Sequence, residues 1–147
     1  MAAPEPGIPD APALLCDSDN LWLAYVVAPS ADERFAVVRF SGVIDHRLSP
    51  INDEGLGEHP YAKAGLQWYS FNELTGSEEV NHWAALRARH WVVTFKDNTL
   101  DVVAEKAEVV IASIQAKDSL TALLAVVAGG AAQQSAPADV TASRPRG

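Results

Sequence analysis

Short apolar segments with the two-residue period of a β-strand recur along this chain, and turn-forming residues separate them. In the segment from Trp91 to Phe95, the two aromatic ends and Val93 between them point to one face of an extended chain. Leu21–Val27 is apolar on both faces, which indicates a strand covered on both sides. Strands that follow one another through short turns usually pair as neighbours, so the pattern predicts an antiparallel sheet.

Six strands and two helices follow from these patterns. The other predicted strands are Phe35–Phe40, which continues towards Ile44 through a kink at Gly42, and Leu66–Phe71, Leu100–Ala104 and Glu108–Ile114. The sequence therefore predicts an α+β fold. Its antiparallel sheet of about six strands forms either a meander or a partly closed barrel, with two helices packed on one face or at one end.

The two predicted helices begin at recognisable caps. Thr75 stands three residues before Glu78, the spacing of a capping box, and predicts a helix over Ser77–Arg89. Asp118 predicts the start of a second helix, which Gly129-Gly130 should end. The apolar stripe expected to face the core in this second helix consists of Leu120, Leu123, Leu124 and Val127.

The 147 residues divide into one domain and two tails. Residues 1–12 are rich in Pro and Ala and are expected to form a flexible leader. Residues 129–147 are rich in Gly, Ala, Gln and Ser and are expected to form a disordered tail, since neither segment can bury enough apolar surface to offset its ordering entropy. Residues 13–128 remain as a single globular domain.

Charge and composition exclude several classes of function. The formal net charge of −8 disfavours binding to nucleic acid or to an anionic membrane surface. The beginning of the chain lacks the basic and apolar regions of a secretory signal, so a cytoplasmic protein is expected. The single cysteine, Cys16, cannot form an internal disulfide and is interpreted as a small strand hydrophobe.

The densest polar cluster lies in a long loop, Asp45–Gly65, with its centre at 51–61. Acids beside a histidine are what general acid–base catalysis requires, so the candidate catalytic residues are Asp53, Glu54 and His59, with His90 from a predicted strand entrance. The candidate ligand-binding residues are Asn52, Trp68, Tyr69 and Trp91.

A purely structural interpretation of the same residues competes with the catalytic one. Asn, Asp and Gly form turns with their own backbone, and His59 before Pro60 favours an extended corner. His90 is equally consistent with a histidine at a helix end, and the aromatic residues with core packing.

No metal site and no cofactor are predicted. The histidines and acids do not match a known ligand spacing, although a divalent-metal site remains an alternative, with the candidate ligands His46, Asp53, Glu54, His59 and His90. Gly55-Leu56-Gly57 lacks the third glycine and the following Lys-Ser or Lys-Thr of a phosphate loop.

Two motifs resemble a family of short, uncharacterised bacterial single-domain proteins. One is Asn52-Asp53-Glu54 followed by His59-Pro60, and the other is Arg89-His90 followed by Thr94-Phe95, Asp97 and Thr99. The resemblance covers about Leu14 to Ala112 and implies a bacterial single-domain protein, without an activity or functional residues to transfer. This chain has Leu100-Asp101 where the family is expected to have an aromatic residue and a glutamate.

These observations favour a small cytoplasmic binding or accessory protein for a small molecule or a protein partner. An enzyme without a cofactor, such as an isomerase, cyclase or lyase that uses the Asp/Glu/His loop, is the first alternative. A metal-binding domain is the second. Whether the protein is an enzyme stays open, and a homodimer is compatible with the sequence.

Overall fold

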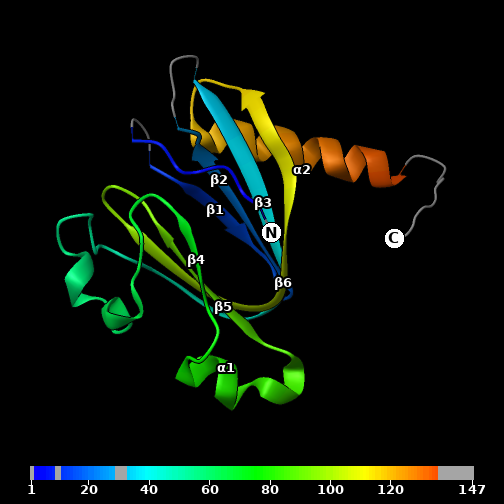
Figure 1. Cartoon of the computed structure of the whole chain (residues 1–147). Coiled ribbons are helices and arrows are strands. Elements are labelled where there is room, and N and C mark those ends of the chain that lie inside the picture. The colour runs from blue at the N-terminus through cyan, green and yellow to red at the C-terminus, as the bar shows by residue number, and fades with distance from the viewer. Residues whose placement is uncertain (1, 9–10, 29–32, 136–147) are drawn as a thin grey trace.

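The computed structural model describes residues 2–8, 11–28 and 33–135, which fold around one strongly bent antiparallel sheet (Figure 1). The predicted α+β class is confirmed, and the sheet is open, so it does not form a closed barrel. The strands are β1 Ala13–Cys16, β2 Asn20–Val26, β3 Arg34–Ser49, β4 Phe71–Leu74, β5 Arg89–Thr94 and β6 Thr99–Gln115. The helices are α1 Glu78–His82 and α2 Ser119–Ser135, with the short 3-10 turns η1 Leu56–Glu58, η2 Ala62–Ala64 and η3 Ala84–Leu86.

Two long strands hold the sheet together. The strand order is β1-β2-β3-β6-β5-β4, so two meanders meet where β3, of 16 residues, pairs with β6, of 17 residues. A single meander was therefore the wrong topology. The two strands predicted between residues 100 and 114 form one strand, because one part of β6 pairs with β5 and β3 and the rest continues along β3. Residues 45–49 belong to β3, so the predicted loop begins later, at Pro50.

A glycine and several bulges bend this sheet. Gly42 has φ +64°, and an added Cβ there would lie 2.8 Å from the Cβ of Glu105. The β3–β6 ladder also shifts register between Phe35 and Val38 and again between Val43 and Asp45. Both features let a long strand change direction, which confirms the predicted kink at Gly42.

The main core lies on the concave side of the bent sheet. Its largest members include Tyr25, Phe40 and Trp91. The predicted alternation turns Trp91 and Val93 of β5, and Phe95 directly after it, towards this core. The Phe40 and Trp91 rings meet edge to face at 5.4 Å. Each strand also has a second face, which points away from this core. In the β5–β6 half of the sheet, that second face carries polar residues.

Helix α2 covers the other side of the β1–β2–β3 end of the sheet (Figure 1). Asp118 caps it by accepting the Thr121 N–H at 2.7 Å, as predicted. Leu123 is buried against Ala24 and Val37, but Leu120 and Leu124 are 56% and 53% exposed, so the predicted four-residue stripe is wrong. The buried stripe of α2 is narrower than predicted, because only one narrow side of the helix contacts the sheet.

Helix α2 does not end at Gly129-Gly130 as predicted but continues to Ser135. Glycine keeps its backbone hydrogen bonds in a helix and costs only about 1 kcal/mol relative to alanine. Residues 136–147 of the predicted tail lie outside the described residues.

The difference between two adjacent leucines in α2 provides a stability test. We expect Leu123→Ala to lower the free energy of unfolding by about 2–3 kcal/mol, because it leaves a cavity against the sheet. Leu124→Ala should change it by less than about 0.5 kcal/mol, because the side chain is already half exposed. Urea denaturation of both variants measures the difference, and equal losses would contradict this packing.

Helix α1 is shorter than predicted. It spans five residues, η3 follows it, and Arg87 ends this region with φ +58°. The cap is Ser77, which accepts the Val80 N–H at 3.2 Å, and not Thr75. Trp83 is 37% exposed, so this region lacks the buried apolar face that would stabilise a longer helix.

The segment expected to be a flexible leader lies in part against β2. The Gly7 N–H donates to the Val26 carbonyl at 2.7 Å, and the buried Tyr25 hydroxyl donates to the Pro4 carbonyl at 2.8 Å. Residues 1, 9 and 10 lie outside the described residues.

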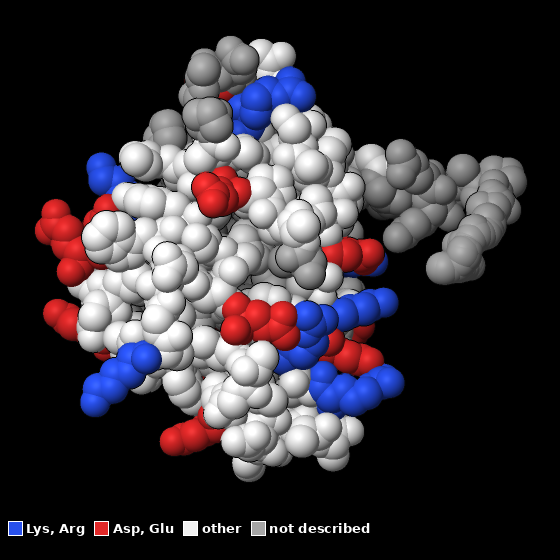
Figure 2. Space-filling model, in the orientation of Figure 1, with Lys and Arg blue, Asp and Glu red and all other residues white. Residues whose placement is uncertain are grey.

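On the face shown in Figure 2, basic side chains are interspersed with acidic ones and form no extended basic patch. None of the helices described is long and apolar enough to span a bilayer.

Candidate functional site

The loop between β3 and β4 covers the second face of the β5–β6 half of the sheet. Two strand threonines on this face hold its ends: the Thr94 hydroxyl donates to the Gln67 carbonyl at 2.7 Å, and the Thr99 hydroxyl donates to the Ile51 carbonyl at 2.8 Å. Leu56, which belongs to the loop, is buried. Thr94 is therefore a buried attachment point for the loop.

Strand register places the polar residues of three strands on this covered face. Asp101 of β6 lies directly opposite Arg47 of β3, and Val103 lies opposite both Asp45 of β3 and His90 of β5. Residues opposite one another in antiparallel strands share a face. The loop brings a further histidine, His59, to the same place.

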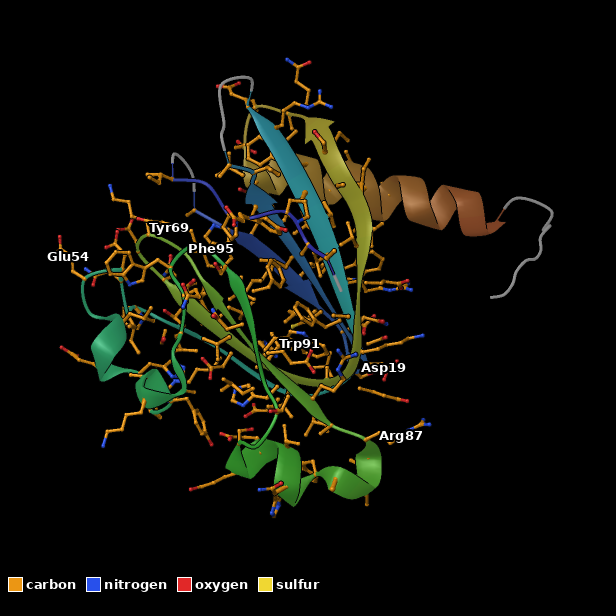
Figure 3. The ribbon with its side chains drawn as sticks, viewed as in Figure 1. Asp19, Glu54, Tyr69, Arg87, Trp91 and Phe95 are labelled. Atoms are coloured by element: carbon orange, nitrogen blue, oxygen red, sulfur yellow. The ribbon has the colours of Figure 1, made fainter. Side chains whose placement is uncertain are left out.

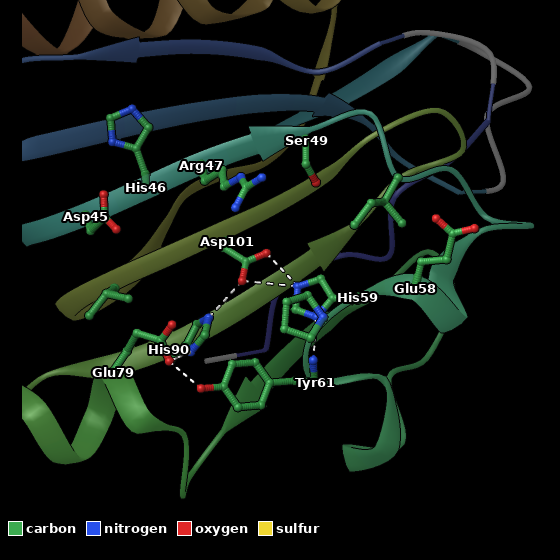
Figure 4. A pocket seen from close by; sticks show the side chains of 13 residues that line it. Asp45, His46, Arg47, Ser49, Glu58, His59, Tyr61, Glu79, His90 and Asp101 are labelled. Carbon is green, nitrogen blue, oxygen red and sulfur yellow. Dashed lines mark hydrogen bonds and ion pairs between the residues drawn. The ribbon is translucent and has the colours of Figure 1, made fainter.

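Two buried histidines meet at one carboxylate (Figure 4). The His59 Nε2 lies 2.8 Å from Asp101 Oδ1 and 3.1 Å from Oδ2. The His90 Nε2 lies 3.0 Å from Oδ2 of the same carboxylate. The side chains of His59 and His90 are 2% and 1% exposed, whereas that of Asp101 is 25% exposed. The imidazoles thus support the carboxylate while part of it still reaches solvent.

The hydrogen bonds place a proton on Nε2 of both rings. An ionised carboxylate only accepts hydrogen bonds, so each Nε2 must donate. The His59 Nδ1 accepts the Tyr61 N–H at 3.0 Å, which makes this ring a neutral imidazole with its proton on Nε2. The His90 Nδ1 lies 3.0 Å from the Ser77 hydroxyl, which can donate to it while accepting the Val80 N–H.

Asp101 is held in its charged form. Burial acts to raise its pKa, but the hydrogen bonds from His90 and His59 together act more strongly in the opposite direction. The net effect is a pKa below the ordinary carboxyl value. Asp101 is therefore a permanent hydrogen-bond acceptor at neutral pH and a weak base.

The exposed side of Asp101 faces a pocket of about 350 Å³. A tyrosine and a glutamate lie on one side of it, where the Tyr61 hydroxyl donates to Glu79 Oε1 at 2.5 Å and accepts the Glu78 N–H at 3.0 Å. Desolvation and the hydrogen bond to Glu79 raise the pKa of Tyr61, so it stays a donor. The charged residues that line the pocket are Asp45, Arg47, Glu58, Glu79 and Asp101.

Of the candidate catalytic residues, His59 and His90 come together here, and Asp53 and Glu54 do not line the pocket. The Asp53 carboxylate accepts the Tyr69 hydroxyl at 2.6 Å, which raises the pKa of Tyr69. The exposed Glu54 lies at the outer end of the loop (Figure 3). The two acids therefore do not share the closed pocket in which they would act on a substrate.

The four candidate ligand-binding residues also lie away from the pocket. Asn52 accepts the Gly55 N–H at 2.7 Å, as a turn-forming residue does. Tyr69 binds Asp53, Trp68 is 62% exposed, and Trp91 is buried in the concave core (Figure 3). The contacts of these residues are described by the structural interpretation, in which they form turns and pack in the fold.

The described residues contain no group of three or more His, Cys, Asp or Glu arranged to hold a metal ion. The nitrogens of His59 and His90 that face Asp101 carry protons and donate them to the carboxylate, so they are not available as ligands in this arrangement. The exposed His46 lies on the rim of the pocket and not with the buried pair. The predicted absence of a metal stays a prediction.

Ser77, His90 and Asp101 form a chain with the residue types of a serine-hydrolase triad. Two observations argue against that chemistry. The Ser77 side chain is buried and caps α1, so its oxygen does not reach the pocket. The ring is also reversed, since in a triad Nε2 faces the serine and Nδ1 faces the carboxylate. The chain supports the carboxylate and does not present a nucleophile.

Asp101 is the site residue that the sequence reasoning missed. A signal for it existed, because Asp101 is the one charged residue among the apolar positions of Leu100–Ala104 and its period turns it away from Leu100 and Val102. Its pairing with His59, which is 42 positions away in the sequence, has no such signal.

No model of a protein family matches this chain, and no curated protein or solved structure matches it. The resemblance to uncharacterised bacterial proteins stays a prediction, and the function has to be argued from the pocket.

Proposed function

We propose that this protein is a binding module that holds a small molecule through a cationic or hydrogen-bond-donating group. The observation that carries the proposal is the Asp101 carboxylate, which two buried imidazole N–H groups hold in place and which remains partly open to the pocket. Preorganised acceptors of this kind bind donors well, because no side-chain freedom is lost when the ligand arrives.

The same contacts make catalysis by proton transfer the weaker alternative. Both nitrogens of His59 and both of His90 are already hydrogen bonded, so neither ring offers a free nitrogen to a substrate. Asp101 is a weak base, because its pKa is lowered. A group that stays ionised and fixed is suited to recognition.

The proposal can be tested with a simple diamine. We expect 1,5-diaminopentane to shift the backbone NMR signals of residues that line the pocket, Val103 and Tyr61 among them. Asp101→Asn should weaken this binding about tenfold or more, because a charge-assisted hydrogen bond contributes roughly 1.5–3 kcal/mol.

Asp19→Asn is the matched control, since it removes the same charge from an exposed residue that does not line the pocket (Figure 3). It should leave the diamine affinity unchanged. The proposal fails if the diamine shifts no pocket signal, or if Asp101→Asn binds it as tightly as the unmodified protein does.

A further inference from the structure

An arginine that forms no ion pair with a described residue lies beside this carboxylate. Arg47 stands directly opposite Asp101 in the β3–β6 ladder, on the same face, where Cβ atoms are about 4.5–5.5 Å apart. The structure nevertheless has no ion pair or side-chain hydrogen bond of Arg47 with any described residue. The Asp101 oxygens bind His59 and His90 instead.

The arginine faces the same pocket as the acids (Figure 4). In that view Arg47 lies on one side of Asp101, and Glu79 with Tyr61 lies on the other. Among the described residues, the pocket thus has one guanidinium without an ion pair, which suits a carboxylate in bidentate geometry. Next to it are fixed acceptors that suit amino groups.

The remaining acids bias the pocket towards a ligand of positive net charge. Without a contribution from the histidines, its four carboxylates and one guanidinium leave a formal charge of −3. Its volume of about 350 Å³ is near the lower end of the roughly 300–1,000 Å³ usual for small-molecule pockets. A single amine would leave Arg47 without a partner, and an anion alone would be repelled by the acids.

We propose that the ligand is a basic amino acid or a close analogue, whose carboxylate binds Arg47 and whose amino groups bind Asp101 and Glu79. This inference rests on the proposed function, because it takes Asp101 as the acceptor for the ligand and adds the anionic end. Arg47 would then select between a zwitterion and a plain amine.

Two of the three probes each lack one group of the third, so together they distinguish the contributions of the two ends of the ligand to binding. The three probes are L-lysine, 1,5-diaminopentane, which lacks the carboxylate, and 6-aminohexanoate, which lacks the α-amino group. We expect lysine to bind about tenfold more tightly than either, since each deletion removes one charge-assisted contact. NMR titration of the labelled protein gives the three dissociation constants.

Arg47→Gln tests the assigned residue. It should reduce the preference for lysine over the diamine to about one, while the diamine binds as well as before or more tightly because a repulsive charge is gone. Arg87→Gln is the matched control, because Arg87 pairs with Glu105 and does not line the pocket. The control should keep the preference for lysine.

The outcomes distinguish this inference from the proposed function. Diamine binding without a preference for lysine overturns the zwitterion and leaves the binding module standing. A preference for lysine that survives Arg47→Gln overturns the role of Arg47. If the diamine shifts no pocket signal, the proposed function fails and this inference fails with it.

Discussion

Replacement of Trp91 by alanine is expected to lower the free energy of unfolding by about 3–5 kcal/mol. The Trp91 side chain is 2% exposed in the concave core, where its ring meets the edge of Phe40, and the Arg89 guanidinium lies 4.8 Å from its centroid. Truncation would remove these contacts and leave a cavity between β5 and the opposite strands. Few other single changes remove so much buried apolar surface from this chain.

Trp68→Ala is the control for this prediction, because Trp68 was a candidate for ligand contact on the same grounds and is 62% exposed. It should change stability by less than about 0.5 kcal/mol. Denaturation followed by far-UV circular dichroism is the suitable measurement, since both variants alter the fluorescence. If Trp91→Ala is as stable as Trp68→Ala, the assignment of Trp91 to the core is wrong.

Replacement of Asp101 by alanine is expected to cost about 2–4 kcal/mol, because it leaves two buried imidazole N–H groups without their acceptor. His59 and His90 cannot reach solvent by a small movement, since each is almost fully buried. The loop over β6 should loosen first, because His59 attaches it to the sheet. Hydrogen exchange of the Tyr61 and His59 amides would report this loosening.

The pH dependence of stability provides a second measure of the same residue. A carboxyl group with a lower pKa in the folded state stabilises the fold above its ordinary value of 3.8, and this contribution is lost as the pH falls through the folded-state pKa. The unmodified protein should therefore lose stability below about pH 4, and Asp101→Ala should lose less.

Asp45→Ala controls both measurements. Asp45 lines the same pocket, but it is exposed and the structure gives its side chain no ion pair or hydrogen bond with a described residue. Its replacement should change stability by less than about 0.5 kcal/mol. A cost for Asp101→Ala no larger than this would mean that the two histidines do not depend on the carboxylate.

Much of the fold could be predicted from the sequence, because the period of apolar residues is a local property. The alternation at Trp91–Phe95 identified both the strand and its core face, and Gly42 marked a kink that its positive φ bears out. Predictions were less accurate where contacts with the rest of the chain determine the outcome. Examples are the length of α1 and the exposure of Leu124 in α2.

The residues of the candidate site could also be predicted only in part. Residue type alone identified His59 and His90 as residues that could carry chemistry, and both lie at the pocket. It also selected Asp53 and Trp91, since an acid in a loop or an aromatic residue in a strand has the same pattern whether it serves a site or the fold.

What the sequence by itself determined is therefore which segments are strands and which face of each is apolar, because a two-residue period follows from the geometry of one extended chain. Only the tertiary structure decided that Asp101 receives both histidines and has Arg47 opposite it. Those contacts depend on the register between β3, β5 and β6 and on the path of the loop. Register and loop path arise from interactions between distant parts of the chain, which the period of a single segment does not contain.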